Sequence, residues 1–192
     1  MKRIFIIHGW EGSPEKDWLP SLKAELEKLG HLVFIPEMPD TNTPVIERWV
    51  TYLASLVGKP DKDTYFVGHS IGCQTILRYL ETVNAPVGGA VFVAGWFDLE
   101  NLENDKVKEI AKPWLTTPIN IAQVKQLLPQ SVLVISDNDP YGAFSKNKEK
   151  FSELGSRIIT LHNAGHITEA DGFIDLPIAL KELANYINLI KI

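Results

Sequence analysis

The chain has 192 residues and a mass of 21.5 kDa, a size that fits one domain. Its 45% hydrophobic and 22% charged residues are typical of a globular protein and exclude the disordered and fibrous classes. The net charge is −5 and no Lys/Arg run exceeds two residues, so the basic footprint of a nucleic-acid-binding protein is missing. The single cysteine, Cys73, excludes an intramolecular disulfide and a zinc site built from several cysteines.

Targeting signals and membrane spans are not found in the sequence. Only four apolar residues follow Lys2 and Arg3 before His8, too few for the hydrophobic region of a signal peptide. No stretch approaches the length that a membrane span needs. We therefore expect a cytoplasmic protein whose single domain covers residues 1–192, with no membrane and no nucleic-acid partner.

Short β-type runs alternate with amphipathic helical segments along the chain. Strands are predicted at residues 3–7, 31–35, 64–67, 89–94, 132–136 and 157–161. Helices are predicted at residues 18–29, 44–57, 71–83 and 178–190. This alternation indicates an α/β fold with about six mostly parallel strands and helices on both faces of the sheet. No segment is long enough for a large lid domain.

Residues 96–130 are the irregular part of the chain, with a short helix candidate at residues 104–112. This segment is either a packed excursion between two strands or a wall of a substrate pocket, because long loops of α/β proteins often carry function. Three tryptophans, Trp10, Trp96 and Trp114, are candidates for lining such a pocket.

A G-x-S-x-G motif, from Gly68 to Gly72, stands directly after a predicted strand and directly before a predicted helix. By chance the pentapeptide occurs in roughly one protein in twenty of this length, so its context matters. Strand–turn–helix is the setting of a nucleophile elbow, in which Ser70 projects from a strained turn and the glycines let neighbouring backbone approach. The alternative is a tight turn in which Ser70 only caps the helix.

Two aspartates and two histidines follow the last two predicted strands. A catalytic serine needs a histidine as its base and an acid that orients this histidine. For the base, His166 lies in a loop after the strand and is preferred to His162, which stands at the strand end. For the acid, Asp137 and Asp139 both qualify by position, although such sequence is also ordinary turn chemistry. At least one of the two is therefore expected to form a turn or a cap.

The segment from His8 to Gly12 follows the first predicted strand, where a second donor of an oxyanion hole is expected. Gly9 and Gly12 would let the backbone approach a tetrahedral intermediate. The backbone N–H of Trp10 is therefore one candidate donor, and the N–H of Ile71 is the other. The alternative is a glycine-rich turn with no role in catalysis.

Together these motifs make the chain resemble the small, lidless α/β-hydrolase family that includes the bacterial YdeN-like proteins and retinoblastoma-binding protein nine. The matching segments are His8-Gly9 with Trp18 downstream, Gly68 to Cys73, Ser136 to Pro140, Gly165-His166, Gly172-Phe173 and Leu176-Pro177. The order Ser70, Asp139, His166 is also that of α/β-hydrolases. The sequence departs from the family where Pro140 follows the acid at once, since many members have a proline a few residues later.

The resemblance implies Ser70 as the nucleophile, His166 as the base and Asp139, rather than Asp137, as the acid. The expected function is a serine hydrolase that cleaves a small ester, thioester or activated amide through an acyl-enzyme on Ser70. The alternative is a catalytically idle protein of the same fold that binds a protein or a ligand. The expected partner is a small-molecule or acylated substrate, with a protein partner as a further candidate.

No cofactor or metal is expected. Glu169 and Asp171 follow His166, but no second histidine at ligand spacing accompanies them, so we interpret them as a solvated loop face. Cys73 is expected to pack in the core, on the inner side of the helix that follows Ser70.

Overall fold

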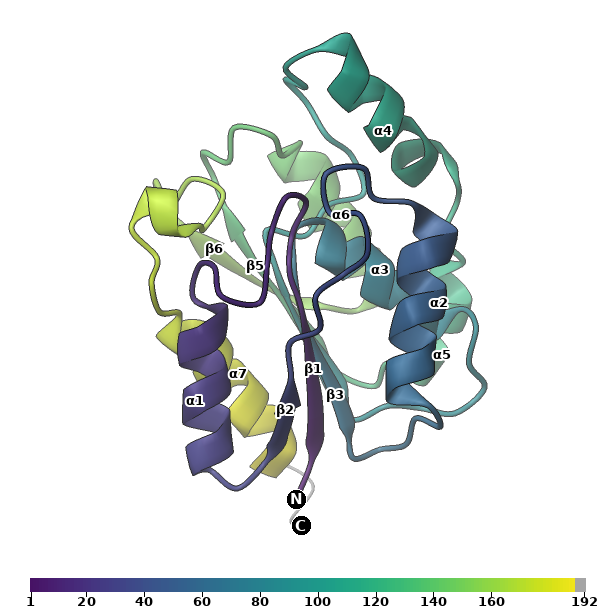
Figure 1. The fold of residues 1–192 in the computed structure, drawn as a ribbon, viewed down its shortest axis with the longest axis vertical. Helices are drawn as coiled ribbons and strands as arrows, with labels where there is room; N and C mark the ends of the chain where they lie inside the picture. Colours follow the sequence, from purple (N-terminus) through teal and green to yellow (C-terminus); the bar gives the residue numbers. More distant parts are fainter. Residues whose placement is uncertain (189–192) are drawn as a thin grey trace.

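The computed structural model describes residues 1–188 of the chain (Figure 1). Six parallel strands form one sheet in the order β2-β1-β3-β4-β5-β6. The strands are β1 (Arg3–Ile7), β2 (Leu32–Phe34), β3 (Thr64–His69), β4 (Gly89–Val93), β5 (Ser131–Ser136) and β6 (Arg157–Leu161). The predicted strand content and direction are confirmed, with boundaries shifted by one or two residues.

Helices cover both faces of this sheet (Figure 1). On one face lie α1 (Leu19–Lys28) and α7 (Pro177–Asn188). On the other lie α2 (Ile46–Val57), α3 (Ile71–Leu80), α5 (Ile121–Leu127) and α6 (Phe144–Leu154). Helix α4 (Asp105–Thr116) projects beyond the edge of the sheet at the top of Figure 1. Residues 189 and 190 of the last predicted helix lie outside the described residues.

The two hydrophobic cores arise from the two-residue period of the strands. In β1, Ile4 and Ile6 pack into the core under α1 and α7. Phe5 and Ile7 point the other way, into the core under α2 and α3. A strand buried on both faces is therefore apolar at every position, which explains the continuous apolar run of the N-terminal sequence.

Two helices were not predicted, and a third is longer than expected. Helix α6 has a narrow apolar stripe, with Phe151 and Leu154 buried among charged neighbours, so its pattern is weak. In the segment 96–130, two asparagine caps start helices: the side chains of Asn104 and Asn120 accept hydrogen bonds from the N–H groups of the first turns. Helix α4 includes Pro113 and ends at Thr116, four residues beyond the predicted end. The irregular segment is thus largely helical.

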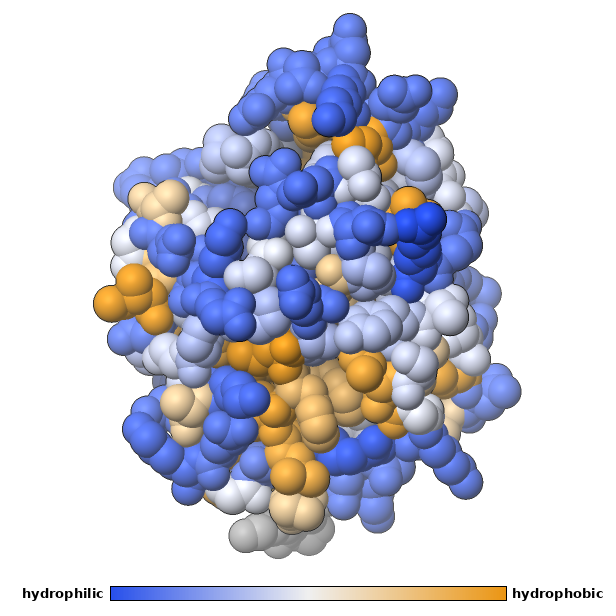
Figure 2. Space-filling model, in the orientation of Figure 1, coloured by the Kyte–Doolittle hydropathy of each residue, from blue (hydrophilic) through white to orange (hydrophobic). Residues whose placement is uncertain are grey.

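The sheet has a short edge at β2. Its side chains Leu32 and Phe34 are exposed, and Figure 2 shows apolar side chains gathered on the lower half of this face. Phe34 stacks on Phe5 of the neighbouring strand, with ring centroids 5.0 Å apart. Within residues 1–188, no helix has the length and apolar composition needed to cross a membrane.

All six strands end at the same edge of the sheet because they run in parallel. The loops after β1, β3, β4, β5 and β6 therefore meet at this edge, at the top of the sheet in Figure 1. Ligand sites of open α/β sheets lie at such carboxyl edges. The motifs singled out in the sequence all belong to these loops.

Candidate active site

Ser70 occupies a strained turn between β3 and α3. Its φ of 53° and ψ of −122° lie in a region that side chains rarely adopt. Its side chain makes no capping hydrogen bond to α3, which argues against the capping alternative. The turn instead places Ser70 in the lining of the pocket described below, as the nucleophile-elbow interpretation requires.

Both glycines of the motif are required by close approach of backbone. A Cβ at Gly68 would lie 2.8 Å from the backbone nitrogen of Cys73, and one at Gly72 would collide with the carbonyl oxygen of Ile7. Without a side chain at Gly68, β3 can turn tightly into α3. Without one at Gly72, α3 can pack against the end of β1. Cys73 is buried, as expected, and its Sγ donates to the Gly68 carbonyl at 3.2 Å. Burial raises the pKa of the Cys73 thiol.

His166 and Asp139 form a shielded pair at this edge. The distance from His166 Nδ1 to Asp139 Oδ2 is 2.7 Å, and the two side chains are 15% and 5% exposed. The other carboxylate oxygen of Asp139 accepts the N–H of Tyr141 at 3.0 Å. The carboxylate is therefore held from both sides and fixes which nitrogen of His166 carries the proton.

The end of β5 also holds the loop in which His166 lies. Three successive N–H groups, of residues 163, 164 and 165, donate to the side chains of Asp137, Ser136 and Asn138 at 2.9–3.0 Å. Asp139 completes the series by binding the His166 ring. The Asp/Asn-rich stretch thus holds the histidine loop in place. The turn expected of one aspartate is formed by Asp139, whose Oδ1 accepts the N–H of Tyr141 two residues on, whereas Asp137 bonds the distant histidine loop.

Asp171 fastens the same loop from the other side, a role that the sequence analysis missed. Its Oδ2 accepts the N–H of His166 at 3.0 Å and both the N–H and the hydroxyl of Thr168. Asp171 is exposed, as expected of a solvated loop face, but its carboxylate also holds the loop of His166, which the sequence interpretation did not include. The pattern Thr168-x-x-Asp171 at the start of a short helix is a capping box, and this signal could have been found.

His162 and Asp137 form a second pair, on the surface. Their Nδ1 and Oδ2 atoms are 2.5 Å apart, but the side chains are 79% and 34% exposed. The bond from the Asn163 N–H, followed by the His162 contact, lowers the pKa of Asp137. Neither residue lines the pocket that contains Ser70.

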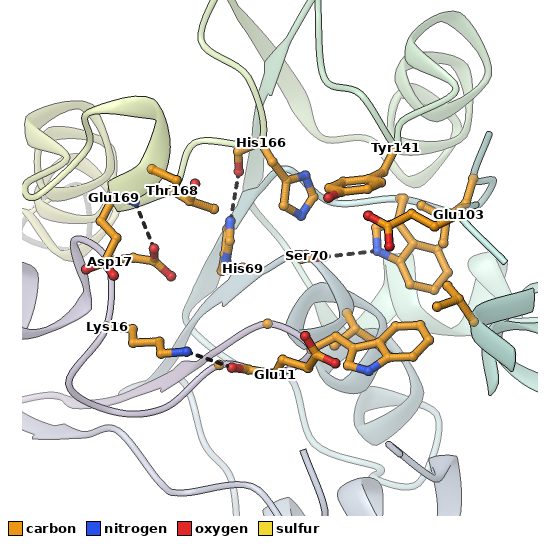
Figure 3. A pocket seen from close by; sticks show the side chains of 18 of the residues that line it. Glu11, Lys16, Asp17, His69, Ser70, Glu103, Tyr141, His166, Thr168 and Glu169 are labelled. Atoms are coloured by element: carbon orange, nitrogen blue, oxygen red, sulfur yellow. Dashed lines mark hydrogen bonds between the residues drawn. The ribbon is translucent and has the colours of Figure 1, made fainter. Parts of the chain in front are cut away.

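Ser70 and His166 line the same pocket, but no hydrogen bond joins the Ser70 hydroxyl to the His166 ring in the described structure. The Ser70 Oγ instead accepts the indole N–H of Trp96 at 3.4 Å (Figure 3). Contacts of this kind are often loose in an unliganded site and tighten around the substrate.

His69, the neighbour of Ser70 in the motif, supports the loop of His166. Its Nε2 donates to the backbone carbonyl of His166 at 3.0 Å, and the two rings are 5.1 Å apart (Figure 3). Burial, followed by repulsion from His166, lowers the pKa of His69 to about 4. His69 is therefore neutral at physiological pH and anchors the loop of His166.

His8 orients the candidate oxyanion loop. Its Nδ1 contacts the carbonyl oxygen of Gly9 at 2.8 Å, and its Nε2 accepts the N–H of Met38 at 3.0 Å. The N–H of Gly12 also donates to the Gly9 carbonyl at 3.1 Å. Because the carbonyl and the N–H of a trans peptide point in opposite directions, the N–H of Trp10 points away from His8.

The two candidate oxyanion donors have no other hydrogen-bond partner. Among the described residues, neither the N–H of Trp10 nor that of Ile71 makes a hydrogen bond. An ideal Cβ at Gly9 would lie 3.4 Å from the Cβ of Ser70, so the loop passes directly beside the serine. The arrangement leaves two free donors near the hydroxyl, as an oxyanion hole requires.

The pocket around Ser70 has a volume of about 400 Å³ and two chemically different sides (Figure 3). One side is mostly apolar: Trp10, Trp96, Leu99, Leu102, Val107 and Tyr141 contribute to it, with the carboxylate of Glu103 on the same side. The other is polar and consists of Glu11, Lys16, Asp17, Thr168 and Glu169. The segment 96–130 thus contributes a pocket wall through its first part. Trp114, expected to line the pocket, is instead buried against Trp49 in the core.

No group of three potential metal ligands occurs within residues 1–188. The chemistry available at this edge is that of a hydroxyl, an imidazole held by a carboxylate, and free backbone donors. These groups suit nucleophilic attack on a carbonyl carbon and proton transfer to a leaving group.

Known proteins that resemble this chain include hydrolases. The chain is 28% identical to YdeN of Bacillus subtilis (strain 168) over 96% of each chain. The crystal structure of YdeN superposes with a TM-score of 0.90, covering 98% of this chain and all of that one. The serine hydrolase RBBP9 of Rattus norvegicus is 23% identical over 85% of this chain and 81% of its own.

A more distant structure shares the fold alone. The esterase RhEst1 from Rhodococcus sp. ECU1013 is 14% identical, with a TM-score of 0.69 over 97% of this chain and 90% of that one. These likenesses confirm the predicted α/β-hydrolase fold. A family model described as serine hydrolase matches residues 4–185. The chain therefore belongs to the serine hydrolase family.

Proposed function

We propose that the protein hydrolyses a small ester, thioester or activated amide through an acyl-enzyme on Ser70, with His166 as base and Asp139 as acid. The observation that carries the proposal is the pocket in which Ser70, on its strained turn, faces a histidine that is held by a shielded carboxylate. The free N–H groups of Trp10 and Ile71 beside the serine add the donors that acyl transfer needs.

In the proposed mechanism, the Ser70 oxygen bonds to the substrate carbonyl carbon while its proton passes to His166 Nε2. The carbonyl oxygen becomes an oxyanion that the N–H groups of Trp10 and Ile71 stabilise. His166 then gives the proton to the leaving group, and the acyl-enzyme remains. Water, activated by His166, attacks this ester, and the proton returns to Ser70 as the acid product leaves. Asp139 stabilises the imidazolium that forms in each half of the reaction.

The pocket supports a small substrate. Its volume of about 400 Å³ lies near the lower end of the range for small-molecule sites. Its apolar side, with Trp96 and Leu99, suits a short acyl chain, and its polar side suits a solvated leaving group. The esterase RhEst1, which shares the fold, shows that ester hydrolysis is compatible with this architecture.

Labelling with a fluorophosphonate tests the proposal directly, because the reagent modifies only an activated serine. We expect stoichiometric labelling at Ser70, located by mass spectrometry, and hydrolysis of p-nitrophenyl acetate by the wild-type protein. Ser70→Ala should lose at least ~1,000-fold in kcat/KM and should not be labelled.

Circular dichroism and thermal unfolding of Ser70→Ala serve as the control for folding. Ser70→Ala that keeps most of the esterase activity would refute the role of Ser70. A folded wild-type protein that is neither labelled nor active would instead favour the idle, ligand-binding alternative.

A further inference from the structure

Trp96 makes a contact with the reacting oxygen that the mechanism above does not use. It follows β4 at the carboxyl edge, and its indole Nε1 lies 3.4 Å from the Ser70 Oγ (Figure 3). The side chain is only 2% exposed, yet the ring forms part of the pocket wall. The indole N–H is thus a buried donor directed at the nucleophile.

The backbone at Trp96 is brought close to Ser70 and held there. A Cβ at Gly95 would lie 2.7 Å from the ring of Phe151 and 3.1 Å from the Sγ of Cys73, so only glycine lets the chain pass this closely over α3. The carbonyl of Trp96 accepts the Gln74 side chain at 2.8 Å, in a buried contact. The next N–H, of Phe97, donates to Asn147 Oδ1 at 2.8 Å.

The same network is anchored deeper in the protein. The side-chain oxygen of Gln74 accepts the Nε–H of the buried Arg78 at 3.1 Å. Arg78 also donates to the backbone carbonyls of Trp114 and Thr117 at 2.9 Å. The position of the indole therefore depends on side chains of α3, the helix that begins directly after Ser70. Donor and nucleophile are fixed to one rigid element, which is how effective hydrogen-bond donors are preorganised.

The chemistry of an indole determines what this contact can do. An indole N–H donates and never accepts, so it binds a lone pair of the Ser70 oxygen and leaves the serine proton free for His166. Hydrogen bonds to a charged oxygen are shorter and stronger than those to a neutral hydroxyl. The contact therefore gains strength as negative charge develops on this oxygen. This happens when the oxygen attacks the substrate, and again when it leaves the acyl group.

We infer that Trp96 is a further catalytic residue of the proposed acyl transfer, whose indole N–H stabilises negative charge on the nucleophilic oxygen of Ser70. It acts on a different atom from Trp10 and Ile71, which serve the oxygen of the substrate carbonyl. Trp96 keeps its proton throughout, so the proton inventory of the mechanism is unchanged. The inference rests on the proposed role of Ser70.

The test replaces the donor and keeps an aromatic ring, with Trp96→Phe. We expect kcat for p-nitrophenyl acetate to fall about 10- to 100-fold, as for loss of a hydrogen bond to a charged group, with KM within about twofold. The second-order rate constant for phosphonylation of Ser70 should fall by a similar factor. Trp114→Phe is the matched control, because it removes a buried indole N–H that donates to the Pro44 carbonyl and keeps both an aromatic ring and the backbone carbonyl that accepts Arg78. It should lower the melting temperature and leave kcat unchanged.

Incorporation of 3-benzothienylalanine at position 96 isolates the N–H, because sulfur replaces it in a ring of the same shape. This variant carries the test if Trp96→Phe unfolds or reshapes the pocket. Full kcat and full labelling rate in the benzothienyl protein would overturn the inference, as would a faster rate, which would mean that the indole restrains the serine. Absence of labelling in the folded wild-type protein would overturn both this inference and the proposed function.

Discussion

Two histidine–aspartate pairs stand a few residues apart where β5 and β6 end, and both join a histidine Nδ1 to an aspartate Oδ2, but their exposure to solvent differs. The pair of His162 and Asp137 is the shorter, at 2.5 Å, but its side chains are 79% and 34% exposed. The pair of His166 and Asp139 is 2.7 Å long, with side chains 15% and 5% exposed. Bond length therefore does not distinguish a functional pair from a surface contact.

The two pairs differ in how far their surroundings exclude water. Water and salt screen the exposed pair, so it contributes little to stability. The shielded pair sits beside Ser70 and is bounded by Tyr141, whose ring meets that of His166 edge-on at 5.2 Å. In such an environment a carboxylate acts strongly on its histidine. Solvent exclusion around His166 therefore favours Asp139 over Asp137 as the acid of the proposed mechanism.

The largest expected effect comes from exchanging each acid for its amide. Asp139→Asn keeps the shape but allows His166 the wrong tautomer, so we expect kcat to fall roughly 10³- to 10⁴-fold. Asp137→Asn should change kcat less than about threefold, because its amide oxygen still accepts the loop N–H. Steady-state kinetics on p-nitrophenyl acetate measures both. Equal losses would mean that the shielded pair is not the functional one.

The next effect concerns the pH dependence of the free energy of unfolding, to which the buried His69 contributes. The pKa of His69 is about 4 in the folded protein, against about 6.5 in an unfolded chain. Between these values the unfolded chain binds a proton that the folded protein does not. The free energy of unfolding should therefore fall as pH is lowered from about 6.5 to about 4, by up to roughly 3 kcal/mol from this group.

Urea unfolding at several pH values measures this slope. His69→Gln keeps an N–H donor for the His166 carbonyl and removes the titration, so its slope should be flatter. A slope unchanged by His69→Gln would contradict the assignment.

The smallest effect concerns the hydrogen bonds by which Asp171 holds the loop of His166. Asp171→Ala removes the acceptor of the His166 N–H and of both Thr168 donors, so the loop loses its fixed position. We expect kcat to fall about tenfold, since small misplacements of a catalytic group are costly. Asp171→Asn, which keeps an acceptor, should recover most of this loss.

Asp175→Ala is the control for charge in this segment, because Asp175 is exposed and its side chain makes no hydrogen bond to a described residue. It should leave kcat unchanged. If Asp175→Ala reduced kcat as much as Asp171→Ala, the effect would come from the change in net charge rather than from the lost hydrogen bonds of Asp171.

The sequence predicts the sheet well because buried parallel strands such as Arg3–Ile7 are continuous apolar runs with little ambiguity. The elbow is predictable for a similar reason: Gly68 and Gly72 are local requirements of a tight turn. Helix α6 is not predictable in this way, since its buried face includes the polar Asn147, which accepts two N–H groups from the segment after β4.

Contacts between distant segments limit the prediction of the site. The Trp96 contact with Ser70 and the His69 contact with the His166 carbonyl join residues 26 and 97 positions apart. Neither leaves a trace in local composition or periodicity. Trp114 illustrates the opposite error: a tryptophan in a loop-like segment suggested a pocket wall, but helix α4 carries it into the core.

The order of the strands also has a consequence for how activity appears during folding. The proposed nucleophile follows β3, the proposed acid follows β5 and the proposed base follows β6, while the candidate oxyanion loop follows β1. No contiguous half of the chain holds a complete site, and parallel pairing joins segments that are far apart in sequence, which folds slowly. Hydrolysis therefore reports on the assembled sheet, and a refolding chain would regain structure in its helices before it regains turnover.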